Sequence, residues 1–234
     1  MPLLESIRAR LSAGGYFGFQ LIGGGLAILV AGWTFGEIAE HVVRGAPLTQ
    51  LDAEIATWFH VNAIPRITDL MLFLSAINGV GAICVSGALF AIVLALRREW
   101  FWLLYLALAL PGGFLLNMLT KAAFQRQRPS FDDPLVTLSS YSFPSGHTMG
   151  ATLFYGTLAA FLVPRVRTRV ARLAIVCAAI MMIVLVASSR VYLGAHYLSD
   201  VLAAVAEGVA WLALCLIAVA TLRRRRLAQA ARSA

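Results

Sequence analysis

Charged side chains are scarce in this 234-residue sequence, at 13% of the chain, against about 25% in a typical soluble domain. Hydrophobic residues make up 60%, and the mean hydropathy is +0.82. A single soluble core cannot enclose so much apolar surface, so an ordinary soluble fold is excluded and the lipid bilayer is the expected solvent. We predict one membrane-embedded domain over residues 1–234, an all-α integral membrane bundle.

Cysteine is scarce too, and its spacing excludes the common thiol sites. Cys84, Cys177 and Cys215 each lie inside an apolar run, and the sequence has no CxxC motif and no Cys/His spacing typical of zinc. We interpret all three as buried small hydrophobic side chains. No cofactor is expected.

Acidic residues are outnumbered by basic ones, eleven to nineteen, which gives a net charge of +8. The basic residues flank apolar runs instead of clustering on a polar domain, so nucleic acid is not an expected partner. If both termini are cytoplasmic, thirteen of the nineteen basic residues lie on that side. This distribution follows the positive-inside rule and predicts cytoplasmic termini, with the polar loop 121–143 outside.

Long apolar runs predict where the chain crosses the membrane, since a spanning helix needs about 20 mostly apolar residues. We predict six transmembrane helices, at about 16–35, 80–96, 100–119, 144–163, 173–188 and 197–222. The first run has no clear cleavage site, and we treat it as an uncleaved span. A partial helix or re-entrant turn is expected from residue 67 to a break marked by Asn78, Gly79 and Gly81. Residues 51–60 are predicted to form a short amphipathic helix, which we interpret as an interfacial connector, with a substrate-gating role as the alternative.

Three polar clusters stand out between Lys121 and Asp200. In the first, Lys121 is the only lysine of the chain and lies seven residues before Arg128. A lone lysine in a chain whose other basic residues are all arginine suggests a point charge that is held in a fixed place. A cation that snorkels to the membrane interface is an equally good alternative. Arg128 precedes a proline, which favours extended backbone, and its guanidinium can bind phosphate bidentately. We interpret Arg126 as a solvated loop charge, with a contribution to phosphate binding as the alternative.

The second cluster, Pro144-Ser145-Gly146-His147, has the pattern of a helix start. Ser145 is a natural N-cap, and the free N–H groups of a first helical turn form an anion site at the positive end of the helix dipole. Gly146 permits close approach of the backbone, and His147 falls in the first turn. Taken alone, the pattern is more typical of a simple N-cap.

In the third cluster, His196 and Asp200 lie four residues apart and therefore share one face of a helix. The carboxylate can accept a hydrogen bond from one imidazole nitrogen and leave the other free to attack, and Arg190 precedes the pair. A His–Asp pair that stabilises a helix start is the alternative. A metal site of His147, His196 and Asp200 is disfavoured because the surrounding cations repel a divalent ion.

Together the clusters resemble the signature of the type-2 phosphatidic acid phosphatase superfamily. Its pattern is Lys-x6-Arg-Pro, then Pro-Ser-Gly-His, then Ser-Arg-x5-His-x3-Asp. Every named position occurs here in order and at the right spacing: Lys121, Arg128, Pro129, Pro144, Ser145, Gly146, His147, Ser189, Arg190, His196 and Asp200. Vanadium haloperoxidases share the motifs, but they are soluble, and the hydropathy of this chain disfavours them.

The resemblance implies a metal-independent phosphatase that acts through a phosphohistidine. His196 would attack phosphorus, Asp200 would orient His196, and His147 would protonate the leaving group. The phosphate oxygens would be held by one set of groups: Lys121, Arg128, Arg190 and the backbone of Ser145 and Gly146.

The same resemblance predicts a membrane lipid as substrate, at the outer face of a bacterial inner membrane. Undecaprenyl diphosphate is our preferred substrate. Phosphatidylglycerophosphate, phosphatidic acid and a lipid A phosphate are alternatives, as is transfer of the phosphate to another lipid. A non-enzymatic lipid or anion transporter is a further alternative from another class. The sequence makes no prediction of oligomeric state.

Overall fold

The computed structural model describes residues 2–45 and 47–233, and all of its regular structure is helical. Met1, Ala46 and Ala234 of the predicted domain lie outside the described residues. The helices, in chain order, are α1 (Pro2–Arg44), α2 (Pro47–Val61), α3 (Pro65–Ile77), α4 (Val80–Leu96), α5 (Trp100–Phe124), α6 (Gly146–Leu162), the 3₁₀ helix η1 (Val163–Arg165), α7 (Arg169–Tyr192) and α8 (Leu198–Ser233). The all-α prediction is therefore confirmed for the described part of the chain.

Four helical segments are long and apolar enough to cross a membrane: Leu21–Arg44, Trp100–Phe124, Arg169–Tyr192 and Leu198–Ala230. A fifth crossing results if α3 and α4, which are bent by 47° at their junction, count as one span. Helix α6 has 17 residues, the lower end of the usual range of roughly 17–25. The chain is thus a multi-pass membrane protein. Each of the six predicted spans coincides with a helix, and the count of six crossings stays a prediction.

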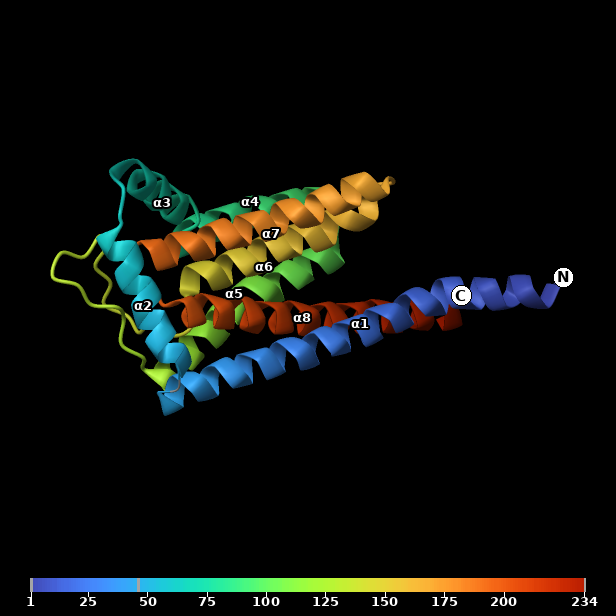
Figure 1. Cartoon of the computed structure of the whole chain (residues 1–234). Helices are drawn as coiled ribbons and strands as arrows, with labels where there is room; N and C mark the ends of the chain where they lie inside the picture. Colours follow the sequence, from blue (N-terminus) through green and yellow to red (C-terminus); the bar gives the residue numbers. More distant parts are fainter. Residues whose placement is uncertain (1, 46, 234) are drawn as a thin grey trace.

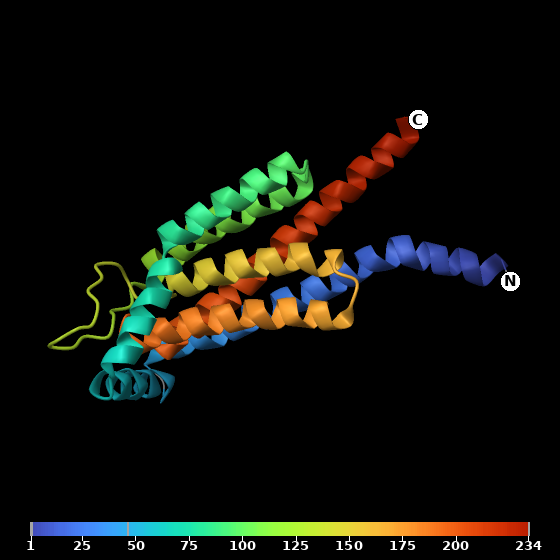
Figure 2. The same cartoon turned by 90° about the horizontal axis from the view of Figure 1, so that it is seen from above.

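The helices form an elongated bundle with two different ends. Helices α4 to α8 run side by side, and α1 follows α8 along much of its length (Figure 1). Helix α2 lies across one end of the bundle, beside the irregular loop 125–145. Both views place the two termini at the opposite end (Figures 1 and 2). The bundle therefore gathers α2 and the predicted outer loop at one end and both termini at the other.

Helix α6 lies at the centre of the bundle and contacts α4, α5, α7 and α8. Its side chains Met149 and Leu153 are fully buried, and Leu153 closes over Gly113 of α5. A Cβ added at Gly113 would lie 2.5 Å from that side chain, so only glycine allows this approach. Small residues at helix contacts are typical of membrane bundles. Because α6 packs against four other helices, its first turn, which carries the second motif, is held at a defined position.

The cysteine prediction is wrong for two of the three residues. Cys84 and Cys177 are exposed, and only Cys215 is buried. The physical reason is the solvent: in a bilayer the outward face of a spanning helix is also apolar, so an apolar run does not distinguish core from surface.

Candidate active site

One end of the bundle brings the three sequence clusters together. Lys121 lies in the last turn of α5, and Arg128 follows in the loop 125–145. The Ser145–His147 segment starts α6, Arg190 lies in the last turn of α7, and His196 and Asp200 flank the start of α8. Contacts between the clusters confirm that they meet: Arg128 with His196, Lys121 with the backbone of Ser142, and the Ser145 N–H with the Asp200 carbonyl.

The His196 ring is almost fully buried, at 2% exposure, and its two nitrogens have different partners. An Nη1 group of Arg128 lies 3.1 Å from Nε2. A guanidinium can only donate, so Nε2 accepts and the proton of the neutral ring is on Nδ1. Burial lowers the pKa of His196 to about 4, and the neighbouring Asp200 offsets only part of that effect. The ring is therefore neutral at physiological pH, with a lone pair on Nε2.

The Asp200 carboxylate is fully buried and well supplied with donors. Its Oδ1 accepts from Arg126 at 2.6 Å, and its Oδ2 accepts from the Tyr197 N–H at 2.9 Å and from the Ser142 hydroxyl. The distance from His196 Nδ1 to Oδ2 is 3.5 Å, at the outer limit of a hydrogen bond. Ser142 Oγ lies equally close to Nδ1. The predicted His–Asp pair is thus present, with Ser142 inserted beside it.

Lys121 and Arg128 both bind the backbone just before the second motif. The ammonium of Lys121 donates to the carbonyls of Tyr141 at 2.8 Å and Ser142 at 3.3 Å. The guanidinium of Arg128 donates to the Ser140 carbonyl at 2.6 Å, to the Tyr141 carbonyl at 3.1 Å, and to the Ala195 carbonyl. Burial lowers the pKa of Arg128. These contacts hold two cations at fixed places beside His196, which favours the point-charge interpretation of Lys121 over a snorkelling side chain.

Arg190 is 2% exposed and has an unused donor. One of its terminal nitrogens donates to the Ser75 hydroxyl, while its buried Nε has no hydrogen-bond partner among the described residues. A buried guanidinium N–H without a partner is costly and rare, so it marks a place for an acceptor such as a phosphate oxygen. Ser75 lies in the last turn of α3, and the sequence interpretation missed it.

The start of α6 has the predicted capped geometry. Ser145 is the N-cap, and its hydroxyl accepts from the N–H of Thr148. His147 is half-buried in the first turn and faces the junction of α3 and α4, because a Cβ added at Gly79 would lie 3.7 Å from its Nε2. The predicted break is present at Asn78 and Gly79, whereas Gly81 lies inside α4, and the break forms one wall of the site.

The interpretation of Arg126 as a solvated loop charge is wrong. Its side chain is only 12% exposed and bridges two buried carboxylates, Asp200 at 2.6 Å and Asp52 at 2.8 Å. Asp52 comes from α2, so this helix is also more than a connector. The partner of Arg126 lies 74 residues away in the sequence, and local pattern alone could not reveal it.

Cations dominate this end of the bundle. Within the described ranges, no group of three or more His, Cys, Asp or Glu side chains is arranged to hold a metal ion. The donor set that the site does present, from an ammonium, guanidinium groups and a helix N-terminus, is the chemistry of an anion site.

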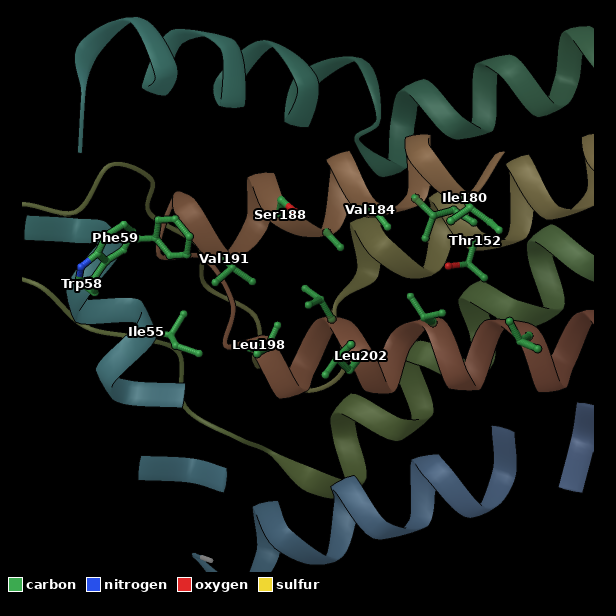
Figure 3. Close-up of a pocket in the computed structure, with 15 residues that line it drawn as sticks. Ile55, Trp58, Phe59, Thr152, Ile180, Val184, Ser188, Val191, Leu198 and Leu202 are labelled. Atoms are coloured by element: carbon green, nitrogen blue, oxygen red, sulfur yellow. The ribbon is translucent and has the colours of Figure 1, made fainter. Parts of the chain in front are cut away.

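An apolar groove of about 690 Å³ runs between α7 and α8, with Thr152 of α6 at its floor (Figure 3). Val191 and Leu198 line it near the site, one and two residues from Arg190 and Asp200 respectively. Trp58 and Phe59 of α2 line the same end (Figure 3). Apolar surface therefore extends from the lipid-facing side of the bundle to the level of the polar cluster.

Comparisons with known proteins show what the chain is similar to. A family model described as the PAP2 superfamily matches residues 100–224, more than half of the chain. Phosphatidylglycerophosphatase B of Bacillus subtilis is 41% identical over 115 residues, which are 48% of this chain and 55% of that protein. The chain thus aligns with about half the length of this curated relative.

A solved structure shares the fold. It is described as the crystal structure of the first transmembrane PAP2-type phosphatidylglycerolphosphate phosphatase from Bacillus subtilis. The superposition has a TM-score of 0.73 at 28% sequence identity, and it covers 80% of this chain and 93% of that one.

Proposed function

The chain belongs to the PAP2 superfamily, and we propose that it is a membrane-embedded phosphatase that hydrolyses the phosphate or diphosphate group of a lipid. One observation carries this proposal: the guanidinium of Arg128 lies against Nε2 of a buried, neutral His196. A cation that binds phosphate oxygens is thereby held beside the lone pair that would attack phosphorus.

In the proposed reaction, His196 Nε2 attacks phosphorus as the bond from phosphorus to the leaving oxygen breaks. The leaving oxygen takes the bonding electron pair and receives a proton from His147, and phosphate stays on His196. Water then attacks the phosphohistidine, and His147 takes its proton, so that phosphate leaves and both histidines are restored. Asp200 keeps the proton of His196 on Nδ1 throughout.

Four groups would bind the phosphate oxygens and stabilise the negative charge that develops on them. These groups are Lys121, Arg128, Arg190 and the backbone at Ser145 and Gly146, where Gly146 supplies the N–H donor because the Ser145 N–H already donates to the Asp200 carbonyl. The unpartnered Nε of Arg190 supports this role, because a phosphate oxygen would supply its missing acceptor. No metal is required in this scheme, since the cations supply the charge that a divalent ion supplies elsewhere.

A lipid substrate is supported by the position of the site at one end of a membrane bundle, beside an apolar groove. Two substrates are the strongest candidates. We prefer undecaprenyl diphosphate as a hypothesis from the sequence, and phosphatidylglycerophosphate is favoured by the names of the two Bacillus relatives. In this scheme the site residues would contact only the phosphate, so they are equally compatible with both.

We further propose that the whole chain is a single domain with six crossings and both termini in the cytoplasm. The site would then face the outside of a bacterial plasma membrane. The common end of both termini, opposite the loop 125–145, supports an even number of crossings and a site on the side away from the termini (Figure 1). The density of arginine near the termini supports the cytoplasm as their side, through the positive-inside rule.

The test is phosphate release in detergent with EDTA present, from both lipids, for wild type and His196→Ala. Wild type should release phosphate from at least one lipid, and His196→Ala should lose roughly 10⁴-fold or more, as nucleophile variants do. Product analysis with a second lipid present would identify phosphate transfer in place of hydrolysis. Activity that appears only with added metal, or persists in His196→Ala, would contradict the proposal.

A further inference from the structure

A chain of buried charges leads from α2 to the centre of the site. Asp52 of α2 is 1% exposed and accepts from Nη2 of Arg126 at 2.8 Å. It also accepts from the backbone N–H of Ser199 at 2.9 Å and from the Ser199 hydroxyl. Arg126 donates through Nη1 to Ser199 Oγ at 2.7 Å and to Asp200 Oδ1 at 2.6 Å. Two carboxylates thus share one guanidinium.

The contacts of Arg126 exclude it from the group of phosphate ligands. Both of its terminal nitrogens already donate to buried carboxylates, and its guanidinium carbon lies 4.3 Å from the centre of the Tyr197 ring. Removing one partner from such a pair leaves an uncompensated buried charge, which is strongly unfavourable. Arg126 is therefore held in place by Asp52 and acts on Asp200.

Helix α2 is fastened to the loop 125–145 at a second point. His60, near its end, lies 2.8 Å from Asp133 and stacks on the Phe131 ring with 4.0 Å between ring centres. Phe131 in turn covers Gly194, whose φ of +64° and 2.8 Å clearance admit no side chain. The two contacts connect α2 to the loop that carries Arg126 and to the turn just before His196.

We propose that Asp52 and Arg126 are positioning residues that orient Asp200 toward His196, which makes α2 part of the catalytic machinery. Arg126 occupies Oδ1 of Asp200, so Oδ2 remains turned toward the Tyr197 N–H, Ser142 and Nδ1 of His196. Asp52 prevents Arg126 from moving closer to Asp200 or into the phosphate site. This inference rests on the proposed function of His196 as nucleophile.

The first experiment compares Asp52→Asn and Arg126→Gln with wild type, and Glu54→Gln is the matched control on the exposed face of α2. We measure kcat, KM and inhibition by inorganic phosphate in detergent. Both variants should lower kcat about 10- to 100-fold, as loss of the outer partners of metal-binding histidines does. KM and the inhibition constant for phosphate should stay within about twofold, and Glu54→Gln should match wild type.

Arg128→Lys supplies the contrast, because Arg128 is a proposed phosphate ligand. It should weaken inhibition by phosphate, whereas Arg126→Gln should not. Weaker phosphate inhibition in Arg126→Gln would overturn the inference by making Arg126 a direct ligand. An unchanged kcat in a folded Asp52→Asn would overturn it as well, with folding checked by gel filtration and thermal unfolding.

A second measurement does not depend on enzymatic activity. The nitrogen NMR signals of ¹⁵N-histidine report which ring nitrogen of His196 carries the proton, after assignment with His196→Ala. Wild type should show the proton on Nδ1, and Asp52→Asn should populate the Nε2–H form. A wild-type ring protonated on Nε2 would overturn the inference. If wild type released no phosphate but showed these signals, the proposed function would fail, while the orientation of Asp200 toward His196 by Asp52 and Arg126 would stand.

Discussion

Nη1 of Arg128 lies 3.1 Å from Nε2 of His196, and this contact determines which imidazole nitrogen is free to react. The guanidinium cannot accept a hydrogen bond, so the lone pair of Nε2 faces it. An incoming phosphate would therefore meet its cation and its nucleophile at the same point. The predictions below start from this relationship.

Replacing Arg128 with lysine should lower kcat/KM about 100-fold or more, similar to the loss of a single oxyanion donor. The guanidinium holds the carbonyls of Ser140, Tyr141 and Ala195 while it contacts His196, and an ammonium cannot span these positions. Steady-state kinetics in detergent measure the loss. Arg44→Lys, at an exposed pair with Glu40, is the control. Equal activity of Arg128→Lys and wild type would show that only charge matters at this position.

The acidic side of the pH profile should reflect the lowered pKa of His196. The reactive ring is neutral, so kcat/KM should persist below pH 6.5 and fall as His196 is protonated near pH 4. In the unfolded chain the ring titrates at its ordinary value of 6.5. Between pH 6.5 and about pH 4, His196 is therefore protonated in the unfolded chain but still neutral in the folded one. Lowering the pH through this range consequently lowers the free energy of unfolding. If the acidic limb of the kcat/KM profile had its midpoint near pH 6.5 and this midpoint were due to His196, the result would contradict a buried, neutral His196 ring.

Filling the groove between α7 and α8 should discriminate between long and short substrates. Leu202 lines the groove and is 47% exposed, so Leu202→Trp obstructs it without disturbing the buried core. We expect KM to rise about tenfold for a long-chain lipid phosphate, since lost burial of a few methylene groups has that effect. A short-chain soluble phosphate should be hydrolysed as by wild type. Leu173→Trp, on α7 outside the groove, is the control.

The opposite result would also be informative. A parallel rise of KM for both substrates would show that Leu202→Trp disturbs the site itself. No change for either would place the hydrocarbon chain elsewhere. The apolar pocket between α4 and α5, lined by Gly87, Leu103 and Phe114, would then be the next place to obstruct.

Cysteine labelling in intact cells tests the orientation. Asp133 lies in the loop 125–145 with a side chain 90% exposed, and Thr168 lies at the start of α7, toward the opposite end. In a background without native cysteines, Asp133→Cys should react with an impermeant maleimide, and Thr168→Cys should react only after lysis. The native cysteines must be removed because Cys84 and Cys177 are exposed. Labelling in the reverse pattern would invert the proposed topology.

Much of the helical architecture could be predicted from the sequence, because apolar runs determine where helices form in a membrane. The ends were harder to predict. Helix α1 covers Pro2–Arg44 where a span of about 16–35 is predicted, since hydropathy marks the bilayer and not the limits of backbone hydrogen bonding. The capped start of α6 at Ser145 was predictable, because capping depends only on neighbouring residues.

The contacts that support the site were not predictable in the same way. Asp52 and Ser75 meet Arg126 and Arg190 only because α2 and α3 fold back over the end of the bundle. Nothing within several residues of either side chain indicates a cationic partner. Ser142 lies two residues before a recognised motif, and only the fold reveals that its hydroxyl contacts both His196 and Asp200.

The two cations that organise the loop before α6 do so mainly through its backbone. Lys121 and Arg128 donate hydrogen bonds to the backbone carbonyls at positions 140–142. The Ser140 hydroxyl is the one side chain of this segment that accepts from either cation. Every amino acid offers a carbonyl, so the contacts of Lys121 and Arg128 with this backbone place no demand on the side chain of Tyr141 and keep the path of the loop whatever residue stands there. Residues 134–139 of the same loop are exposed or half-buried and make none of the contacts described above, so a library for altered headgroup selectivity should be built there and should leave Phe131 and Asp133 unchanged.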